Sequence, residues 1–231
     1  MARERAIEKG KEVEKMKRGL VAGIIFAAAL VLVPLHEMQA EPRGSVIVAL
    51  GDSLTAGLGL PQDEAFPAQL EAALRARGKD VTVVNAGVSG DTASAALKRL
   101  DWALPDDAGA VIVELGGNDA LQGLPPEATK AALTEIIEKL QARGLPVLLA
   151  GMEAPRNMGN EYVEEFRAVY TDLAAQYDVV FYPFFLDGAA LTDGMMQGDG
   201  IHPTAKGVAA IVANMLPKVD ELLAKVEAQK E

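Results

Sequence analysis

The chain has 231 residues, of which half are hydrophobic and none is cysteine, and its formal net charge at pH 7 is −11. This length and composition suit one sizeable α/β domain and exclude a disordered chain, a cysteine nucleophile, thiolate metal sites and a disulfide scaffold. Residues 1–40 hold seven Lys/Arg and five Asp/Glu, so the rest of the chain holds 15 Lys/Arg and 28 Asp/Glu, and this net charge of −13 argues against nucleic acid as a partner.

An apolar segment precedes the acidic part of the chain. Residues 19–35 are uncharged, and the Lys/Arg cluster directly in front of them is the positive flank that export signals carry. We therefore divide the chain into residues 1–40, an N-terminal extension with a signal peptide or membrane anchor, and residues 41–231, a single domain. We expect this domain to be exported, as a periplasmic or secreted protein.

Two details of the N-terminal segment leave alternatives open. Ala40 suits the position before a cleavage site, but Met38 is larger than the residue usually found two places earlier. An uncleaved anchor formed by residues 19–35 is therefore the alternative, and it is the only membrane contact that we expect. Met16 followed by two basic residues resembles an ordinary signal start, which suggests the hypothesis that translation begins at Met16 and not at Met1.

Beyond the N-terminal segment, apolar runs of strand length alternate with amphipathic stretches of helical period. The runs predict strands at Ser45–Leu50, Val81–Ala86, Ala110–Leu115, Leu145–Ala150 and Val179–Phe184. The stretches predict helices at Glu64–Arg77, Thr92–Leu100, Pro126–Arg143, Asn160–Gln176 and Thr204–Val226. Five successive βα units form one parallel sheet with helices on both faces, so the sequence predicts an α/β fold.

The first predicted strand runs into a tight turn that presents a serine. Residues 46–50 are apolar, as in a parallel strand covered on both faces, and Gly51 ends the run before Asp52 and Ser53. Ligands of open α/β sheets bind beyond the carboxyl ends of the strands, so Ser53 lies where chemistry occurs in such folds. Asp and Ser also favour helix N-caps, so a purely structural turn is the alternative for this stretch alone.

Further polar or glycine-rich turns supply the other parts of a serine hydrolase. The domain has a single histidine, His202, and Asp199 three positions earlier can face it, so they could serve Ser53 as base and orienting carboxylate. The backbone amides of Ser53 and Gly90 and the side-chain amide of Asn118 could donate to a developing oxyanion. Each turn alone is also consistent with an ordinary loop or cap.

Four blocks of these residues, in this order, resemble the GDSL/SGNH hydrolases, and within them the bacterial exported branch of thioesterases, lysophospholipases and arylesterases. The blocks are Gly51-Asp52-Ser53-Leu54, Ser89-Gly90-Asp91, Gly116-Gly117-Asn118-Asp119 and Asp199-Gly200-Ile201-His202-Pro203. The resemblance implies a flavodoxin-like three-layer α/β/α sandwich with a five-stranded parallel sheet, the SGNH hydrolase fold. It also implies a triad of Ser53, Asp199 and His202 and an oxyanion hole of Ser53, Gly90 and Asn118.

The resemblance implies hydrolysis of carboxylic esters or thioesters of acyl or aryl groups through an acyl-enzyme. We expect a small-molecule ester, thioester or lysophospholipid as substrate, no metal or other cofactor, and a monomer. In this family the loops after the third and fourth strands border the acyl pocket, which implicates Leu121, Leu124, Met152, Ala154 and Met158 in substrate binding. The larger apolar side chains among them suit core packing equally well.

Two other functions fit parts of the same pattern. A polysaccharide O-acetyl esterase would keep the triad and the fold but would need an aromatic face that grips carbohydrate. A flavodoxin-like module would use the glycine-rich turns to hold a phosphate or a flavin. Such a binding module has no need for the Asp199-to-His202 spacing, which favours the hydrolase.

Overall fold

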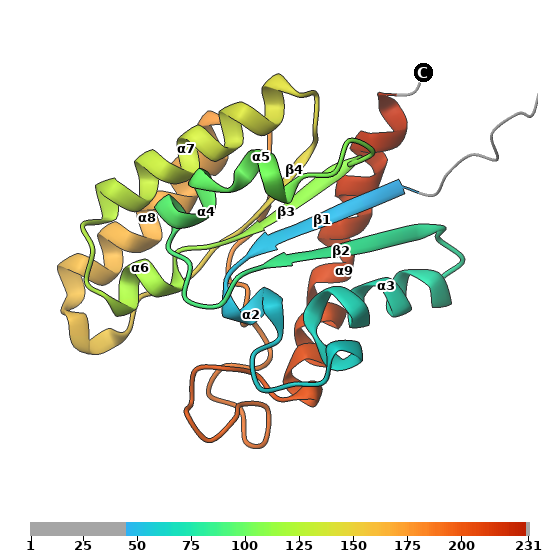
Figure 1. The fold of residues 1–231 in the computed structure, drawn as a ribbon. Coiled ribbons are helices and arrows are strands. Elements are labelled where there is room, and N and C mark those ends of the chain that lie inside the picture. Colours follow the sequence, from blue (N-terminus) through green and yellow to red (C-terminus); the bar gives the residue numbers. More distant parts are fainter. Residues whose placement is uncertain (1–44, 230–231) are drawn as a thin grey trace, which may run out of the picture. The chain divides into compact units, whose positions relative to one another are not determined.

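The computed structural model describes residues 45–229, and the predictions made for residues 1–40 lie outside the described residues. A parallel sheet of five strands, in the order β2-β1-β3-β4-β5, forms the centre of the domain (Figure 1). The strands are β1 (Ser45–Gly51), β2 (Val81–Gly87), β3 (Ala110–Glu114), β4 (Val147–Ala150) and β5 (Val180–Tyr182). This strand order is that of the flavodoxin-like folds, as the resemblance to the GDSL/SGNH hydrolases implies.

Helices cover both faces of the sheet. They are α2 (Ser53–Ala56), α3 (Phe66–Ala76), α4 (Ala93–Lys98), α5 (Leu100–Ala103), α6 (Gly117–Leu121), α7 (Pro126–Ala142), α8 (Asn160–Gln176) and α9 (Ala205–Ala228), with 3-10 turns at Gln62–Glu64 and Arg156–Met158. Helices α3 and α9 pack on one face, and α4, α7 and α8 pack together on the other, which makes three layers (Figure 1). Between residues 45 and 229, no helix combines the length and the hydropathy needed to cross a membrane.

Some elements are shorter than their sequence patterns predict, and proline accounts for two of these differences. Strand β4 begins at Val147 and not at Leu145, because Pro146 has no N–H to donate to the sheet. Strand β5 ends at Tyr182, directly before Pro183. The helix predicted at residues 92–100 is divided at Arg99 into α4 and α5.

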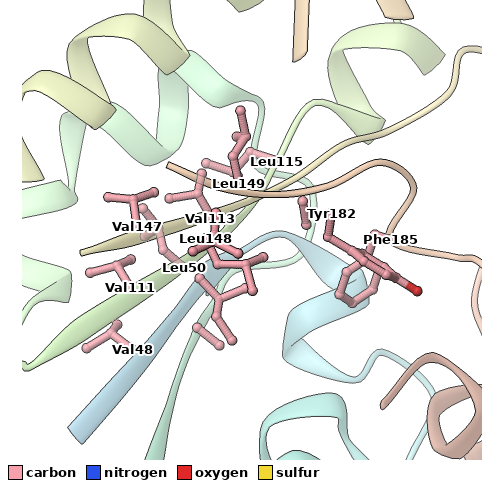
Figure 2. Packing of buried hydrophobic residues seen from close by; sticks show 14 of the residues in the cluster. Val48, Leu50, Val111, Val113, Leu115, Val147, Leu148, Leu149, Tyr182 and Phe185 are labelled. Atoms are coloured by element: carbon pink, nitrogen blue, oxygen red, sulfur yellow. The ribbon is translucent and has the colours of Figure 1, made fainter. Parts of the chain in front are cut away.

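The core lies on the three central strands. Every residue of β3 and β4 is buried, and so are the last five residues of β1. Figure 2 shows valine and leucine side chains of these strands packed side by side. Burying each such side chain stabilises the fold by about 1.5–3 kcal/mol. The packed core therefore holds in place the strand ends from which the polar turns leave. Connections leave β1 and β3 in opposite directions along the sheet, and a crevice for ligands forms at such a switch point.

Candidate active site

The serine turn follows β1 at this switch point. Asp52 is the N-cap of the short helix α2, and its Oδ1 atom accepts a hydrogen bond from the backbone N–H of Leu54 at 2.9 Å. Ser53 is the first residue of this helix, and 8% of its surface is exposed. The sequence left open whether this turn is a helix cap or a reactive site. In the structure Asp52 makes the cap, and Ser53 is presented beside it.

A chain of hydrogen bonds joins Ser53 to the loop before α9. The Nε2 atom of His202 lies 2.9 Å from Ser53 Oγ, and its Nδ1 atom lies 2.7 Å from Asp199 Oδ2. The hydrogen bond to His202 holds the pKa of the Asp199 carboxyl well below its usual range, so this group is an ionised acceptor. Nδ1 of the neutral ring must then carry the hydrogen, which leaves Nε2 to accept the hydroxyl proton of Ser53.

The backbone around Asp199 fixes the position of its carboxylate. Asp199 Oδ1 accepts the N–H groups of Ile201 and His202 at 2.9 and 3.0 Å, so both oxygens of the carboxylate have partners. The side chain of Asp199 is nevertheless 46% exposed, whereas that of His202 is only 14% exposed. Water can therefore reach the carboxylate but has little access to the ring.

Gln197 links the loop that carries His202 to the segment that follows Ser53, and the sequence gives no means to predict this contact. Its backbone N–H donates to the carbonyl of His202 at 2.7 Å. Its side-chain amide donates to the carbonyls of Pro203 and Leu58, each at 2.9 Å. Because Leu58 follows the helix that begins at Ser53, this side chain links the two segments in addition to the hydrogen bond between His202 and Ser53.

The turns that carry Gly90 and Asn118 meet beside Asp52. Gly90 has φ +89°, a backbone conformation that favours glycine, and a side chain added there would point into open space. The Nδ2 atom of Asn118 donates to Asp52 Oδ2 at 3.0 Å and to the carbonyl of Asp91 at 2.9 Å. Both acceptors are oxygens, so the amide of Asn118 can only face them with its nitrogen.

Two buried acids lie beneath the serine turn. Glu114 ends β3 beside Gly51 and is fully buried, and its Oε2 atom accepts the hydroxyl of Thr55 at 2.7 Å. Its Oε1 atom has no hydrogen-bond partner in the part of the chain that the structure describes. Burial raises the pKa of Glu114 well above its usual range, and it raises the pKa of Asp52 from 3.8 to about 6. Each carboxyl is therefore easier to protonate in the folded chain than in the unfolded chain.

The raised pKa of Asp52 predicts stability that increases as the pH falls. Between pH 3.8 and about pH 6, the folded state binds more protons than the unfolded state. The Asp52 carboxyl therefore stabilises the fold fully below pH 3.8, and this contribution is lost as the pH rises through about 6. From about pH 8 to about pH 4, the free energy of unfolding of the parent chain should rise relative to Asp52→Asn by about 2 kcal/mol. Chemical denaturation of both chains at each pH measures this difference, and a difference that shrinks on acidification would contradict the prediction.

An apolar cavity of about 490 Å³ opens beside Ser53 and His202. Three of the five predicted substrate-binding residues line it, namely Leu121, Met152 and Ala154, whereas Leu124 and Met158 do not. Contact of any of the five with a substrate stays a prediction. The loop between β5 and α9 adds apolar lining that the sequence did not single out: Phe184, Leu186, Leu191, Met196 and Ile201.

Groups that could coordinate a metal are scattered over the described domain. Among residues 45–229, no three His, Asp or Glu side chains lie close enough together to hold a metal ion. The arrangement beside the cavity instead offers a hydroxyl, an imidazole and a carboxylate in series, with N–H groups nearby. These are the groups that acyl transfer through a serine requires.

The sequence matches one family over most of the described domain. Residues 49–210 match the model of the GDSL-like lipase/acylhydrolase family. The chain is 38% identical over 201 residues to Esterase TesA of Pseudomonas aeruginosa, an alignment that covers 87% of this chain and 98% of that protein. It is 40% identical over 158 residues to Thioesterase 1/protease 1/lysophospholipase L1 of Escherichia coli, with 68% of this chain and 74% of that protein covered.

A solved structure shares the fold at a similar level of identity. The chain resembles the crystal structure of AlinE4, an SGNH-hydrolase family esterase, with a TM-score of 0.66 and 46% sequence identity. The alignment covers 78% of this chain and 97% of that one. The likeness therefore spans nearly the whole of the compared esterase.

Proposed function

This chain belongs to the GDSL-like lipase/acylhydrolase family and is an ester hydrolase, and we propose that it cleaves carboxylic esters and thioesters of acyl or aryl groups through Ser53, His202 and Asp199. The observation that carries the proposal is the hydrogen-bonded series from Ser53 Oγ through His202 to Asp199, at the mouth of an apolar cavity. A hydroxyl bonded to an imidazole that a carboxylate orients is an activated nucleophile.

The proposed reaction has two halves. Ser53 Oγ attacks the carbonyl carbon of the ester while its proton passes to His202 Nε2, and Asp199 stabilises the imidazolium that forms. The tetrahedral intermediate then collapses as Nε2 gives this proton to the departing alcohol or thiol, which leaves an acyl group on Ser53. In the second half, water gives a proton to Nε2 and its oxygen attacks the acyl carbon. When this second tetrahedral intermediate collapses, Nε2 returns the proton to Ser53 Oγ, and the carboxylic acid leaves.

We place the oxyanion of the intermediate between the backbone N–H groups of Ser53 and Gly90 and the side-chain amide of Asn118. Both Nδ2 hydrogens of Asn118 are engaged before substrate arrives, one by Asp52 and one by the carbonyl of Asp91. The charged oxyanion is a stronger acceptor than this carbonyl, so it competes for the second hydrogen while Asp52 keeps the first. The carboxylate of Asp52 thereby holds the amide in the orientation that donates.

Replacing Asn118 with alanine is therefore expected to lower kcat by about 10²–10³-fold, with little change in KM. The amide stabilises charge that develops only in the transition state, so its loss affects the rate more than substrate binding. Steady-state kinetics on p-nitrophenyl butyrate measure both constants. An equal loss of activity in Asn157→Ala, an exposed asparagine in the 3-10 turn Arg156–Met158, would contradict a specific role for Asn118.

The lining of the cavity supports acyl or aryl groups as the part of the substrate that is bound. Among the described residues that line it, Phe184 is the only aromatic one. An aromatic face that could grip a polysaccharide is therefore missing from this lining. A substrate panel tests the preference: p-nitrophenyl esters of increasing chain length, an acyl-CoA, a lysophospholipid and acetylated xylan. Xylan deacetylation faster than cleavage of every other substrate would contradict the proposal.

We further propose that the domain is exported, a proposal supported by the apolar segment 19–35 and the basic cluster before it. Expression of the full chain in a bacterium, followed by fractionation and N-terminal sequencing, tests it. A mature chain that begins just after Ala40 in the periplasmic fraction supports cleavage by signal peptidase. Intact chain in the membrane fraction supports the anchor, and intact chain in the cytosol contradicts export.

A further inference from the structure

Arg99, at the junction of α4 and α5, reaches back to the two turns beside the candidate active site. Its Nε atom donates to Asp91 Oδ2 at 2.6 Å, and its Nη2 atom donates to the carbonyl of Gly51 at 3.0 Å. The side chains of Arg99 and Asp91 are only 15% and 14% exposed. The guanidinium therefore bridges the turn after β2 and the end of β1 in a largely dry environment, where such charge-assisted bonds are strong.

The bridged segment is the one that carries Gly90. Its first residue, Val88, donates its N–H to the same Gly51 carbonyl at 3.1 Å, and the N–H of Asp91 closes the turn by donating to the carbonyl of Val88 at 3.1 Å. Gly90 itself lies between these anchors and is exposed. The anchors at its two sides, and not contacts of its own, therefore set the direction of its N–H group.

Asp91 connects the bridge to Asn118 as well. Its carboxylate is held by Arg99, and its carbonyl accepts the Nδ2 hydrogen of Asn118. A shift of Asp91 would therefore move an acceptor of the Asn118 amide and the peptide next to Gly90 together. One guanidinium is thus connected, through Asp91, to the peptide next to Gly90 and to one of the two acceptors that hold the Asn118 amide before substrate arrives.

We propose that Arg99 is a positioning residue for the oxyanion hole, which it aligns through Asp91. The inference rests on the roles proposed above for Gly90 and Asn118. Arg99 touches no part of the substrate in this scheme, and it acts by fixing the distance between the end of β1 and the turn that carries Gly90. Lysine cannot replace it fully, because a single ammonium group lacks the planar fork that satisfies two acceptors in fixed geometry.

The test compares Arg99→Ala with a matched control, Arg77→Ala. Arg77 also pairs with an aspartate, Asp220, at 2.7 Å, but on the exposed surface between α3 and α9. On p-nitrophenyl butyrate, Arg99→Ala should lower kcat by about tenfold to a hundredfold and change KM by less than about threefold, because a small misplacement of donors costs that much in rate. Arg77→Ala should stay within about twofold of the parent in both constants.

Rescue distinguishes positioning from general stability. Guanidinium chloride at low, non-denaturing concentration should restore part of kcat in Arg99→Ala, because the free guanidinium ion can occupy the site of the lost side chain. It should not raise kcat in Arg77→Ala. Thermal unfolding followed by circular dichroism checks that both variants are folded. A folded Arg99→Ala with kcat within about twofold of the parent would overturn the proposal.

A double-mutant cycle covers the case in which Arg99→Ala does not fold. Asp91→Asn keeps the shape of its side chain and Arg99→Lys keeps the positive charge, and each should lower kcat severalfold on its own. If Arg99 acts through Asp91, adding Arg99→Lys to Asp91→Asn should lower kcat further by less than about twofold. Losses of kcat that multiply fully in the double variant would overturn the proposal. A parent chain that a fluorophosphonate probe fails to label would instead contradict the proposed function itself.

Discussion

Ser53→Ala is expected to lower kcat/KM for p-nitrophenyl esters by at least about 10⁴-fold and to abolish labelling by a fluorophosphonate probe. The Oγ atom is the group that the proposal places in the covalent intermediate, so neither His202 nor the oxyanion donors can substitute for it. Residual hydrolysis above the rate in water should persist, because substrate binding and the oxyanion donors remain in place.

The fold should be unaffected by this change. Within residues 45–229, the only side-chain hydrogen bond of Ser53 is with His202, and alanine is a good helix former at the start of α2. Thermal unfolding of the variant should therefore match that of the parent. Ser94→Ala, an exposed serine on α4, is the matched control and should keep full activity and labelling. Labelling that survives in Ser53→Ala would show that the nucleophile is another residue.

The sequence predicts the sheet and the convergence of the polar turns because both follow from parallel strands. Apolar runs fix the strands, and the carboxyl ends of parallel strands lie at one edge, so Ser53, Gly90 and Asn118 had to fall near one another. The single histidine of the domain and its spacing from Asp199 then leave little choice of partners. The structure brings Ser53, His202 and Asp199 within hydrogen-bond distance, and their catalytic roles stay predictions.

The supporting contacts could not be predicted, because nothing local distinguishes them. Arg99 lies in a helical stretch where an arginine is an ordinary surface residue, and its importance depends on how α4 ends. Gln197 depends on the path of a loop that has no regular hydrogen bonding to predict. Glu114 did leave a signal, since a carboxylate at the end of a wholly apolar strand is rarely buried without a reason.

Short elements were also missed, for a different reason. Helices α2 and α6 have four and five residues, too few for a helical period to show in the sequence. They form because backbone groups at the strand ends need partners: Asp52 caps α2, and Gly116, with φ +111°, starts α6. Tertiary anchoring, and not local preference, therefore shapes the backbone around the site.

Asp199→Asn is expected to lower kcat by about 10⁴-fold, and by more than Asp199→Ala does. The asparagine would place an N–H donor 2.7 Å from His202 Nδ1, where the carboxylate now accepts. Nδ1 would then have to be the unprotonated nitrogen, so the ring hydrogen would move to Nε2 and face Ser53 Oγ. In this tautomer the imidazole cannot take the serine proton, although every atom stays in place.

Alanine removes the carboxylate without imposing the wrong tautomer. The side chain of Asp199 is 46% exposed, so water can occupy the vacated space and either accept from or donate to Nδ1. We expect a loss of about 10²–10³-fold in kcat for Asp199→Ala, which retains the favourable tautomer for part of the time. Steady-state kinetics give the order of the two losses, and the ¹⁵N chemical shifts of the ring report which nitrogen carries the hydrogen.

The relative loss of kcat in Asp199→Asn and Asp199→Ala shows whether Asp199 orients the imidazole ring or acts only through its negative charge. If Asp199 acted only through its charge, both substitutions would remove that charge and would lower kcat equally. Asp193→Asn, an exposed aspartate in the same loop, removes a charge without touching His202 and should keep kcat within about twofold of the parent. An Asp199→Asn chain more active than Asp199→Ala would contradict the tautomer argument, because the amide would then be supporting the ring better than water does.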